Sequence, residues 1–566
     1  MARLTLQERL EISAIEAERA RRGFVARALN SPTLRWRYGA PRVDQLLIVP
    51  HDLRTPDPSF WYEVCHGQFG MAGSLARLNG HSPFDIIPPS RDWSRALHGF
   101  GWLRHCAAAA EPEAGKAARQ LAVEWAIRNR KGTGEPWHPE VLARRVISWL
   151  SHAGLLLEGA DERTYNTIAA SLGLQLVRLS SAWREAAAGE PRLLALTALV
   201  LADLCVAGRD RRLEADLPLL LDELDRQILP DGGHVSRNPA TLIELLLDLL
   251  PFRQCFRARG RTQPARLDAA VTEMLSMARF LRMGDGLLAR FNGVSVGMPA
   301  RIATVMAYAD TNEPPSIHAK NSGYERLEQG DTILIADCGS PPPVILAGEA
   351  QAGCLSFEMS SGAQLILSNG GAPGAAYHDW LAAARATASH NTLELGETSS
   401  SRLIGNRRIE EILGGMPIRG PAVPYLDDLG SDNGEVGFEA SHDGYLKRFG
   451  IIHKRRITIS NNGRRIVGTD HLNPPRGVLR LKSDIPFAIH FHLHPGVICS
   501  RAEKVGTATI ELPGQRWRMA CEGARMVIEE SAYFADASGP LNRMQIVLRG
   551  ATFGETEVRW AFTRLA

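Results

Sequence analysis

The chain has 566 residues, of which 45% are hydrophobic and 22% are charged, a balance typical of folded globular proteins and not of disordered ones. Its 65 Lys and Arg residues nearly match its 62 Asp and Glu residues, so the overall charge gives no support to nucleic-acid binding. Eight widely spaced cysteines form no CxxC pair, which excludes the usual zinc-ribbon and thioredoxin patterns.

Residues 1–90 form a mixed segment, which we predict packs on the helical domain that follows. The first 24 residues mix charged and apolar side chains and predict one amphipathic helix, and a Pro-rich extended stretch follows. They lack the apolar core of a signal peptide, and no run of about 20 apolar residues is present to span a membrane. We therefore predict a cytoplasmic protein, with the periplasm as the alternative.

Residues 91–285 form the predicted helical domain. Apolar side chains recur at positions i, i+3, i+4 and i+7 in stretches such as residues 117–129 and 140–157. Six or more such helices follow in series, and several are apolar on almost every side, so they must bury against one another. A bundle, a solenoid and a ring of helical hairpins all satisfy this pattern.

Residues 286–566 form the predicted second half of the chain, where short β-branched or alternating runs are separated by Gly, Asn and Pro. The sequence SNNGRR at residues 460–465 predicts a hairpin turn, because Asn-Gly tolerates the positive φ of a tight turn. Many strands without intervening helices predict a large antiparallel β-sandwich.

The first candidate binding segment is GEPWHPEVLARRVISWL, residues 134–150. Arg145 and Trp149 are four residues apart and share one helical face, and Trp137 precedes them. An arginine that pairs with a carboxylate, next to an indole that stacks on a ring, suits an anionic sugar. The alternative is that both tryptophans belong to the core and that Arg145 makes a local contact.

Two further segments carry polar residues in unusual places. His234, Arg237 and Asn238 lie in a loop between two strongly apolar helices, where solvated turn residues are the alternative. His390 and Asn391 open an otherwise apolar strand, so His390 could reach the floor of a cleft, although a single strand histidine often has a structural role. The chain has no GxGxxG, Walker, HExxH or GxSxG motif.

Five segments in chain order together resemble the heparinase II/III family of polysaccharide lyases. They are WHPEVLARRVISW, ILPDGG, SGYERLEQGDTILIADCG, LSFEMSSGAQLILSNGG and ARATASHNTLELG, and the resemblance extends from about Trp93 to Thr563. It implies an α+β multidomain fold, with an N-terminal incomplete α/α toroid followed by a large antiparallel β-sandwich. It also implies β-elimination at a uronic acid. That reaction needs a group that neutralises the uronate carboxylate, a base for the C5 proton and an acid for the leaving oxygen.

The chain departs from the family pattern at the residues expected to carry the chemistry. Where the family has an HxHxD motif this chain has Glu349 and Gln351, and Asn369 replaces the expected metal-binding aspartate. His390 is then the one remaining member of three expected zinc ligands, so we predict no zinc and no cofactor. The region that usually supplies the neutralising residue is altered to GEPRLLALTAL, residues 189–199.

Three functions follow from these residues. The first is a lyase that acts on an anionic polysaccharide or oligosaccharide; the second is a carbohydrate-binding protein without catalysis on the same fold. The third is a glycoside hydrolase that pairs Asp231 with Asp285 or Glu349. We expect His390 to face an interdomain cleft opposite the loop of residues 234–238 and to titrate near pH 6.5. The oligomeric state is left open. The predicted catalytic residues are His390, Asn238, Arg237, Tyr377 and Tyr324, and the predicted substrate-binding residues are Trp137, Arg145, Trp149, His234 and Asn391.

Overall fold

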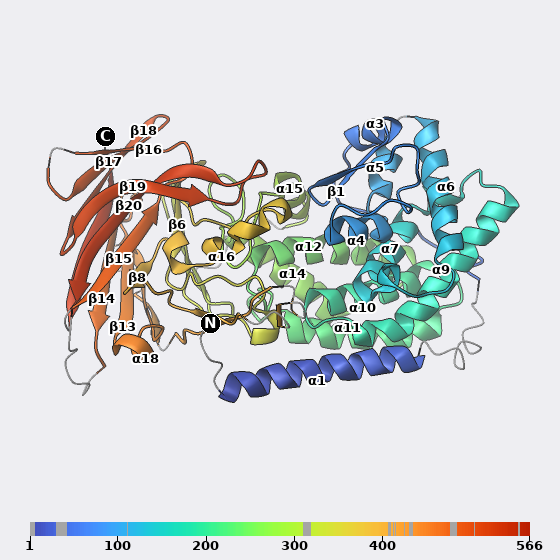
Figure 1. The fold of residues 1–566 in the computed structure, drawn as a ribbon, viewed down its shortest axis with the longest axis horizontal. Coiled ribbons are helices and arrows are strands. Elements are labelled where there is room, and N and C mark those ends of the chain that lie inside the picture. The colour runs from blue at the N-terminus through green and yellow to red at the C-terminus, as the bar shows by residue number, and fades with distance from the viewer. Residues whose placement is uncertain are drawn as a thin grey trace.

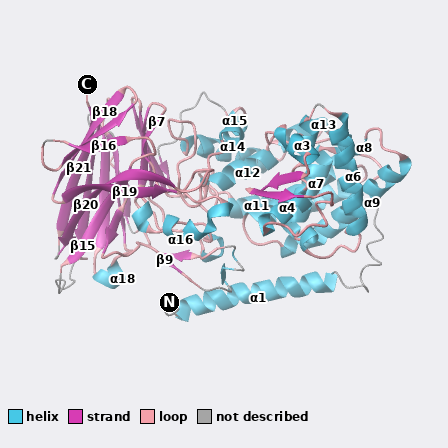
Figure 2. Ribbon diagram, turned by 45° about the horizontal axis from the view of Figure 1, so that its top comes forward, coloured by secondary structure: helices cyan, strands magenta, loops and turns pink. Residues whose placement is uncertain are grey.

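The fold is taken from a computed structural model, in which helices fill one end of the molecule and strands fill the other (Figure 1). Figure 2 shows the same division by secondary structure. The predicted order of a helical half and a strand half is therefore confirmed. The described residues are 6–29, 42–109, 111–309, 318–405, 409–410, 413, 415–423, 425–429, 434–475, 484–502, 504–552 and 555–565.

The helical half is built around α10, whose run of leucines and alanines is buried on every side. Contacts with α7, α9, α11, α12 and α13 surround it, which explains why its sequence has no polar face. The bounds are α3 Ser59–Cys65, α4 Arg91–Gly99, α5 Leu103–Ala108, α6 Pro112–Arg128, α7 Pro139–Ser151, α8 Ala153–Leu157, α9 Glu162–Ala182, α10 Glu190–Cys205, α11 Asp210–Gln227, α12 Pro239–Leu249, α13 Pro251–Ala258, α14 Ala265–Phe280 and α15 Pro299–Met306. A small hairpin, β1 Gln68–Met71 and β2 Ser74–Arg77, accompanies them.

Capping residues and prolines determine where several of these helices begin. Ser90 accepts a hydrogen bond from a backbone N–H of α4, Asp161 does the same for α9 and Asn238 for α12. Proline stands in the first turn of α7, α10 and α12, where its missing N–H costs no hydrogen bond. Helix α15 lies beyond the predicted change at residue 285 and packs against α12 and α14, so helical structure continues further than we predicted.

The strand half contains three large sheets, and every pairing between described strands is antiparallel. Their orders are β3-β4-β5-β6-β7, β19-β20-β15-β8 and β11-β12-β13-β14-β21-β18-β17-β16. The bounds are β3 His318–Ala319, β4 Tyr324–Gln329, β5 Thr332–Asp337, β6 Phe357–Ser361, β7 Gln364–Leu367, β8 Leu393–Leu395, β9 Arg402–Leu403, β10 Ile418–Arg419, β11 Tyr425–Asp428, β12 Val436–His442, β13 Ile452–Ile459, β14 Arg465–Asn473, β15 Ile485–His492, β16 Ile498–Arg501, β17 Thr507–Leu512, β18 Gln515–Glu522, β19 Arg525–Tyr533, β20 Leu541–Thr552 and β21 Thr556–Arg564. Short helices, α16 Leu381–Ala384 and α18 Leu446–Phe449, interrupt this half.

The predicted turn at residues 460–465 is confirmed between β13 and β14. Gly463 has a φ of 68°, and its N–H donates to the carbonyl of Ser460 at 2.8 Å. The inner faces of the three sheets share one apolar core, in which Phe357 of β6 stacks on Trp560 of β21 with ring centroids 5.5 Å apart. Phe491 of β15 packs edge-on against the same tryptophan at 5.0 Å.

A charged cluster is enclosed in this apolar core. The carboxylate of Asp470 accepts hydrogen bonds from Nε of Arg455 at 2.7 Å, from Nε2 of His453 at 2.7 Å and from Nε1 of Trp560 at 2.8 Å. Arg455, His453 and Asp470 have no exposed surface. Burial alone would raise the pKa of Asp470, but Arg455 and His453 hold it well below its usual range. The charge of Asp470 is thus fully compensated inside the sandwich.

Helix α1, Leu6–Leu29, is the predicted amphipathic helix and lies along the outside of the helical half (Figure 1). Its buried Ile12 and Ile15 face the protein, and Arg22 donates to the carbonyl of Ala186 at 3.0 Å. Near its other end, Glu11 pairs with Arg419 of β10 at 3.1 Å. Helix α1 therefore contacts both halves of the chain. None of the helices in the described ranges is long and apolar enough to cross a membrane.

Candidate functional site

Arg237 joins the helical half to the sandwich. It lies in the loop before α12 with a φ of 59°, and its guanidinium donates to the carbonyls of Ser322 at 2.7 Å and Ser340 at 2.8 Å. It also forms an ion pair with Asp337 at the end of β5. A side chain at Gly339 would bring a Cβ to 2.3 Å from Nη2 of Arg237, so this glycine leaves the room that the guanidinium needs.

Further hydrogen bonds connect the Arg237–Asp337 ion pair to residues of the sandwich. Tyr324 donates to the carbonyl of Arg237 at 2.5 Å, and the amide of Asn292 donates to Tyr324 at 2.9 Å and to Asp337 at 3.1 Å. The backbone N–H of Gln351 donates to Asn292 at 3.3 Å. The side chain of Gln351 then meets Nε2 of His390 at 3.2 Å. We call this set the junction network: Arg237, Asn292, Tyr324, Asp337, Gln351 and His390.

The junction network unites three predicted catalytic residues, but it also encloses them. His390 is 1% exposed, so the expectation that it faces an open cleft and titrates near pH 6.5 is wrong. Burial lowers the pKa of His390 to about 4. Tyr324 is 1% exposed and burial raises the pKa of its hydroxyl, while Arg237 is committed to Asp337. None of the three presents a free group to solvent.

The prediction of a sugar-binding face on α7 is also wrong, because its residues are buried. Trp137, Arg145 and Trp149 are buried in the helical core, with 6%, 0% and 1% of their surface exposed. The guanidinium carbon of Arg145 lies 3.9 Å from the ring centroid of Trp125. Its nitrogens donate to Gln175 at 3.1 Å and to two backbone carbonyls at 2.8 Å. The face that these residues share is turned inward, so they line no path for a sugar.

The remaining predicted residues have local structural partners. His234 is buried between Gln227 at 2.9 Å and Ser236 at 2.7 Å, and burial lowers its pKa to about 4. Asn391 is buried and donates to the carbonyl of Phe357 at 2.8 Å. Tyr377 lies in a short 3-10 helix, Ala375–Trp380, and donates to the carbonyl of Ser538 at 2.7 Å, away from the junction network.

A cavity of about 280 Å³ lies beside the junction network, between the start of α10, α12, α15 and the segment of residues 287–298. Among the predicted site residues that the structure describes, Asn238 reaches it. Asn238 caps α12 through its oxygen and donates from Nδ2 to Glu349 at 2.8 Å. Glu349 occupies the place where the sequence comparison expects a histidine. We call this cavity the interdomain pocket.

The carboxylate pair of the hydrolase hypothesis is not assembled. Asp231 accepts hydrogen bonds from the backbone N–H groups of Gly233 at 3.1 Å and Ser322 at 2.7 Å, and it holds a turn. Asp285 accepts from the backbone of Leu287 at 2.9 Å in another turn. Of the three acids named for this chemistry, Glu349 alone lines the interdomain pocket.

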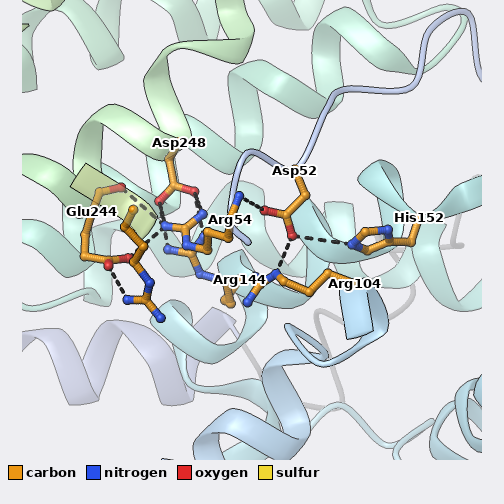
Figure 3. A network of polar contacts seen from close by, with 8 residues as sticks. Asp52, Arg54, Arg104, Arg144, His152, Glu244 and Asp248 are labelled. Carbon is orange, nitrogen blue, oxygen red and sulfur yellow. Dashed lines mark hydrogen bonds and ion pairs between the residues drawn. The ribbon is translucent and has the colours of Figure 1, made fainter. Parts of the chain in front are cut away.

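A charged network that the sequence did not predict leads from the interdomain pocket into the helical half (Figure 3). Asp248 of α12 accepts from Arg144 of α7 at 2.6 Å and from Arg54 at 2.8 Å. Arg54 also pairs with Glu244 at 3.0 Å, and Arg301 of α15 pairs with Glu244 from the pocket side. Burial would raise the pKa of Asp248, but the two arginines lower it to about 2.

The same network continues to the segment that follows α1. Asp52 pairs with Arg104 of α5 at 2.8 Å and approaches Nε2 of His152 at 3.4 Å. Burial alone would raise the pKa of Asp52, but His152 and Arg104 hold it well below its usual range. No sequence signal could have revealed these pairs, because Arg54 and Asp248, for example, are 194 residues apart.

The residues present do not fit a zinc ion. His390 directs Nδ1 to the carbonyl of Ala386 at 2.8 Å and Nε2 to Gln351. The oxygen of Asn369 accepts from the backbone of Asn391 at 2.9 Å. Neutral amides are poor ligands for zinc beside one imidazole. Within the described ranges, no three His, Cys, Asp or Glu side chains are grouped to hold a metal ion.

Acid is expected to destabilise the protein through its buried histidines. The pKa values of His234 and His390 are about 4, whereas an unfolded histidine has a pKa near 6.5. Between these values the unfolded chain binds more protons, so the free energy of unfolding falls as the pH drops, by up to about 1.4 kcal/mol per pH unit for each histidine. Denaturant unfolding at pH 7, 6 and 5 measures this before most carboxylates titrate.

His390→Gln is expected to reduce the slope of that pH profile by the contribution of one histidine. His81→Gln is the matched control, because His81 is exposed. A stability that stays constant between pH 7 and pH 5 would contradict the placement of the neutral histidines in the interior.

Comparison with known proteins adds relatives of two kinds. Residues 311–561 match the family model described as "Heparinase II/III-like, C-terminal". The chain is 32% identical to FtsZ-localized protein C of Caulobacter vibrioides, over 97% of this chain and 96% of that protein. The crystal structure of heparinase III superimposes with a TM-score of 0.71 over 95% of this chain and 89% of the other, at 12% identity. Heparan sulfate lyase HepC from Pedobacter heparinus gives 0.62, with 95% and 88% covered at 15% identity. These structures establish the predicted fold class, a helical toroid-like domain followed by an antiparallel β-sandwich.

Proposed function

Because this chain belongs to the heparinase II/III-like family, we propose that it binds a polysaccharide or oligosaccharide in the interdomain pocket. The observation that carries this proposal is the composition of the pocket. Asn238 and Glu349 form a hydrogen-bonded pair there, while Val294, Met298 and Ile302 supply an apolar wall. Sugar-binding sites commonly combine a few placed polar groups with apolar surface, and the pocket offers both.

Binding without β-elimination is the function that the geometry favours. His390 and Tyr324 were the expected proton-transfer groups, and both are enclosed in the junction network. Arg237 would have to abandon a buried Asp337 in order to neutralise a uronate carboxylate. An arginine removed from such a partner leaves an unpaired buried charge, which is strongly unfavourable.

A lyase remains the second candidate function, on account of Asn238 and Glu349. Asn238 lines the pocket, as the neutralising residue of a lyase would, and its amide already meets an acidic oxygen. Glu349 is exposed and is placed to accept a proton from a bound sugar. Incubation with a panel of uronate polymers separates the two functions, because elimination creates an unsaturated product with new ultraviolet absorbance.

We further propose that the protein acts where FtsZ is located. The support is the relative named FtsZ-localized protein C, which is 32% identical over nearly the whole of both chains. A fluorescent fusion should coincide with labelled FtsZ in cells, and the purified protein should sediment with FtsZ polymers. Diffuse fluorescence together with no co-sedimentation would contradict this location without touching the sugar-binding proposal. The cytoplasmic location stays a prediction, which the fusion also tests.

Asn238→Ala is expected to weaken oligosaccharide binding by about tenfold, a loss of about 1.4 kcal/mol, because one hydrogen-bonding group of the pocket is removed. It should also lower the stability by about 0.5–2 kcal/mol through the lost helix cap. Asp161→Ala removes the equivalent cap from α9, far from the pocket. That control should lose similar stability and keep its affinity. Calorimetric titration and thermal unfolding measure the two effects, and equal affinities of the two variants would contradict the proposed site.

A further inference from the structure

Each charged side chain in the lining of the interdomain pocket faces an opposite charge that the protein itself supplies. Within the described part of the chain, five such side chains line the pocket: Glu190, Glu244, Glu349, Arg290 and Arg301. Glu244 forms ion pairs with Arg54 at 3.0 Å and with Arg301. Arg290 lies 3.7 Å from the carboxylate of buried Glu358. Three of the five lining charges are therefore compensated by direct ion pairs.

The other two carboxylates, Glu190 and Glu349, face arginines that lie behind the lining. Burial raises the pKa of Glu190 to about 7, and the positive charge of Arg144 opposes that shift. Burial lowers the pKa of Arg385 to about 10, and the negative charge of Glu349 opposes that shift. Arg385 donates to the carbonyl of Ala350, the residue that follows Glu349, at 2.7 Å. Both carboxylates thus have a cation of the protein near them.

The charges in and behind the lining add to zero when all of them are ionised. Arg144 also donates two hydrogen bonds to Asp248. With these partners included, the pocket and the side chains around it contain five carboxylates and five arginines. Asp285 and Arg543, which also act on Arg290, add one charge of each sign. A charged ligand would therefore lose its hydration in the pocket without finding a free counter-charge, which is strongly unfavourable.

The pocket suits the uncharged hydroxyl groups of a sugar. The amide of Asn238 donates to Glu349 at 2.8 Å, and both side chains border the cavity. A sugar hydroxyl both donates and accepts, so it can bind to this pair without changing the charge of the pocket. Val294, Met298 and Ile302 offer an apolar surface for the face of a ring. A cavity of about 280 Å³ lies at the lower end of the range for small-molecule sites, which fits about one sugar ring.

We propose that the interdomain pocket takes one uncharged sugar unit of a neutral oligosaccharide and discriminates against charged sugars of either sign. This inference rests on the proposed function and names its ligand class. It replaces the anionic partner that the resemblance to the lyases implies, because a uronate carboxylate would enter a pocket whose arginines are already paired.

Two pairs of trisaccharides that differ in charge test the proposal on the full chain. The galacturonate trimer is compared with its methyl ester at pH 8, and the glucosamine trimer with the N-acetylglucosamine trimer at pH 6, where the amino groups are protonated. In each pair the uncharged sugar is expected to bind at least about tenfold more tightly, as measured by calorimetric titration. The two pairs carry opposite charges, so a general attraction to one sign cannot produce both results.

Two substitutions in the lining are expected to shift this discrimination in opposite directions. Glu349→Gln removes a negative charge but keeps an acceptor for Asn238, so the penalty on the galacturonate trimer should fall by about tenfold. Arg301→Met removes a positive charge, so the penalty on the glucosamine trimer should fall instead. Arg253→Met and Glu162→Gln, both at exposed positions outside the pocket, are the matched controls and should leave both penalties unchanged.

Glu190 adds a dependence on pH to the same comparison. This carboxyl is mostly ionised at pH 8 and mostly protonated at pH 6, because its pKa is about 7. The charged groups that face it are Arg144, Glu244, Asp248 and Glu349. Protonation leaves one arginine of the set without a counter-charge, so the penalty on the galacturonate trimer should shrink from pH 8 to pH 6 in the wild type. Glu190→Gln imitates the protonated form and should show the smaller penalty at both pH values.

The outcomes separate this inference from the proposed function. Equal affinities within either pair, or tighter binding of a charged member, overturn the inference while the binding of sugars stands. Penalties that stay unchanged in Glu349→Gln, Arg301→Met and Glu190→Gln overturn the assignment to the charges of the pocket. If none of the four trisaccharides binds, the proposed function fails and the inference fails with it.

Discussion

Asp470→Asn is expected to lower the free energy of unfolding by about 3–5 kcal/mol, because it leaves the charge of Arg455 without a counter-charge in the interior of the sandwich. Arg455 has no exposed surface, and its guanidinium donates to the carboxylate of Asp470 at 2.7 and 3.1 Å. The isosteric amide keeps the volume, so a cavity contributes nothing to the loss. Chemical denaturation followed by circular dichroism measures it.

Asp331→Asn is the matched control, since Asp331 makes a surface ion pair with Arg564 at 3.4 Å and its side chain is 70% exposed. Exposed pairs contribute about 0–1 kcal/mol, so this variant should unfold close to the wild type. Equal stabilities for the two variants would show that the enclosed charge of Arg455 is compensated by another group.

Arg237→Met should cost a similar amount, about 3–5 kcal/mol, but its effect should be concentrated at the boundary between the two halves. The substitution removes the hydrogen bonds to the carbonyls of Ser322 and Ser340 and leaves the carboxylate of Asp337 buried with Asn292. The sandwich has a large apolar core separate from that of the helical half, which extends only to a few residues of the first sheet, Ala319, Tyr324, Ile335 and Leu365. Differential scanning calorimetry is therefore expected to show a broadened or divided transition in the variant.

Arg253→Met provides the comparison for this change. Arg253 is 57% exposed and pairs with Asp268, which is 50% exposed, at the surface of the helical half. Its loss should shift the transition very little and leave its shape unchanged. A single sharp transition for Arg237→Met at the wild-type temperature would show that the halves are held together elsewhere.

The fold could be predicted from the sequence because the helical spacing of apolar residues and the alternation typical of strands each extend over a long part of the chain. The apolar run of α10 and the Asn-Gly turn between β13 and β14 depend on residues that are neighbours in the chain. The start of α12 also carries a local signal, Asn238 followed by proline, but we predicted Asn238 as a catalytic residue and not as a helix cap. Such features need no knowledge of distant contacts.

The candidate site was less predictable because its properties depend on distant partners. Spacing placed Arg145 and Trp149 on one face of α7, but it could not tell that this face is turned toward Trp125. The sequence identifies the motif around His390, whereas the burial of His390 depends on elements that come from elsewhere in the chain. Glu190 belongs to the altered region of residues 189–199, and only the fold brings it into the lining of the interdomain pocket together with Glu349.

Helix α1 connects the helical half and the sandwich along the outside of the molecule. It is anchored to the helical half through Arg22 and to the sandwich side through Glu11. A rotation of one half relative to the other would change the distance between these two contacts. A straight helix does not stretch, so such a motion must first detach one end of α1. Helix α1 therefore restrains the relative position of the helical half and the sandwich.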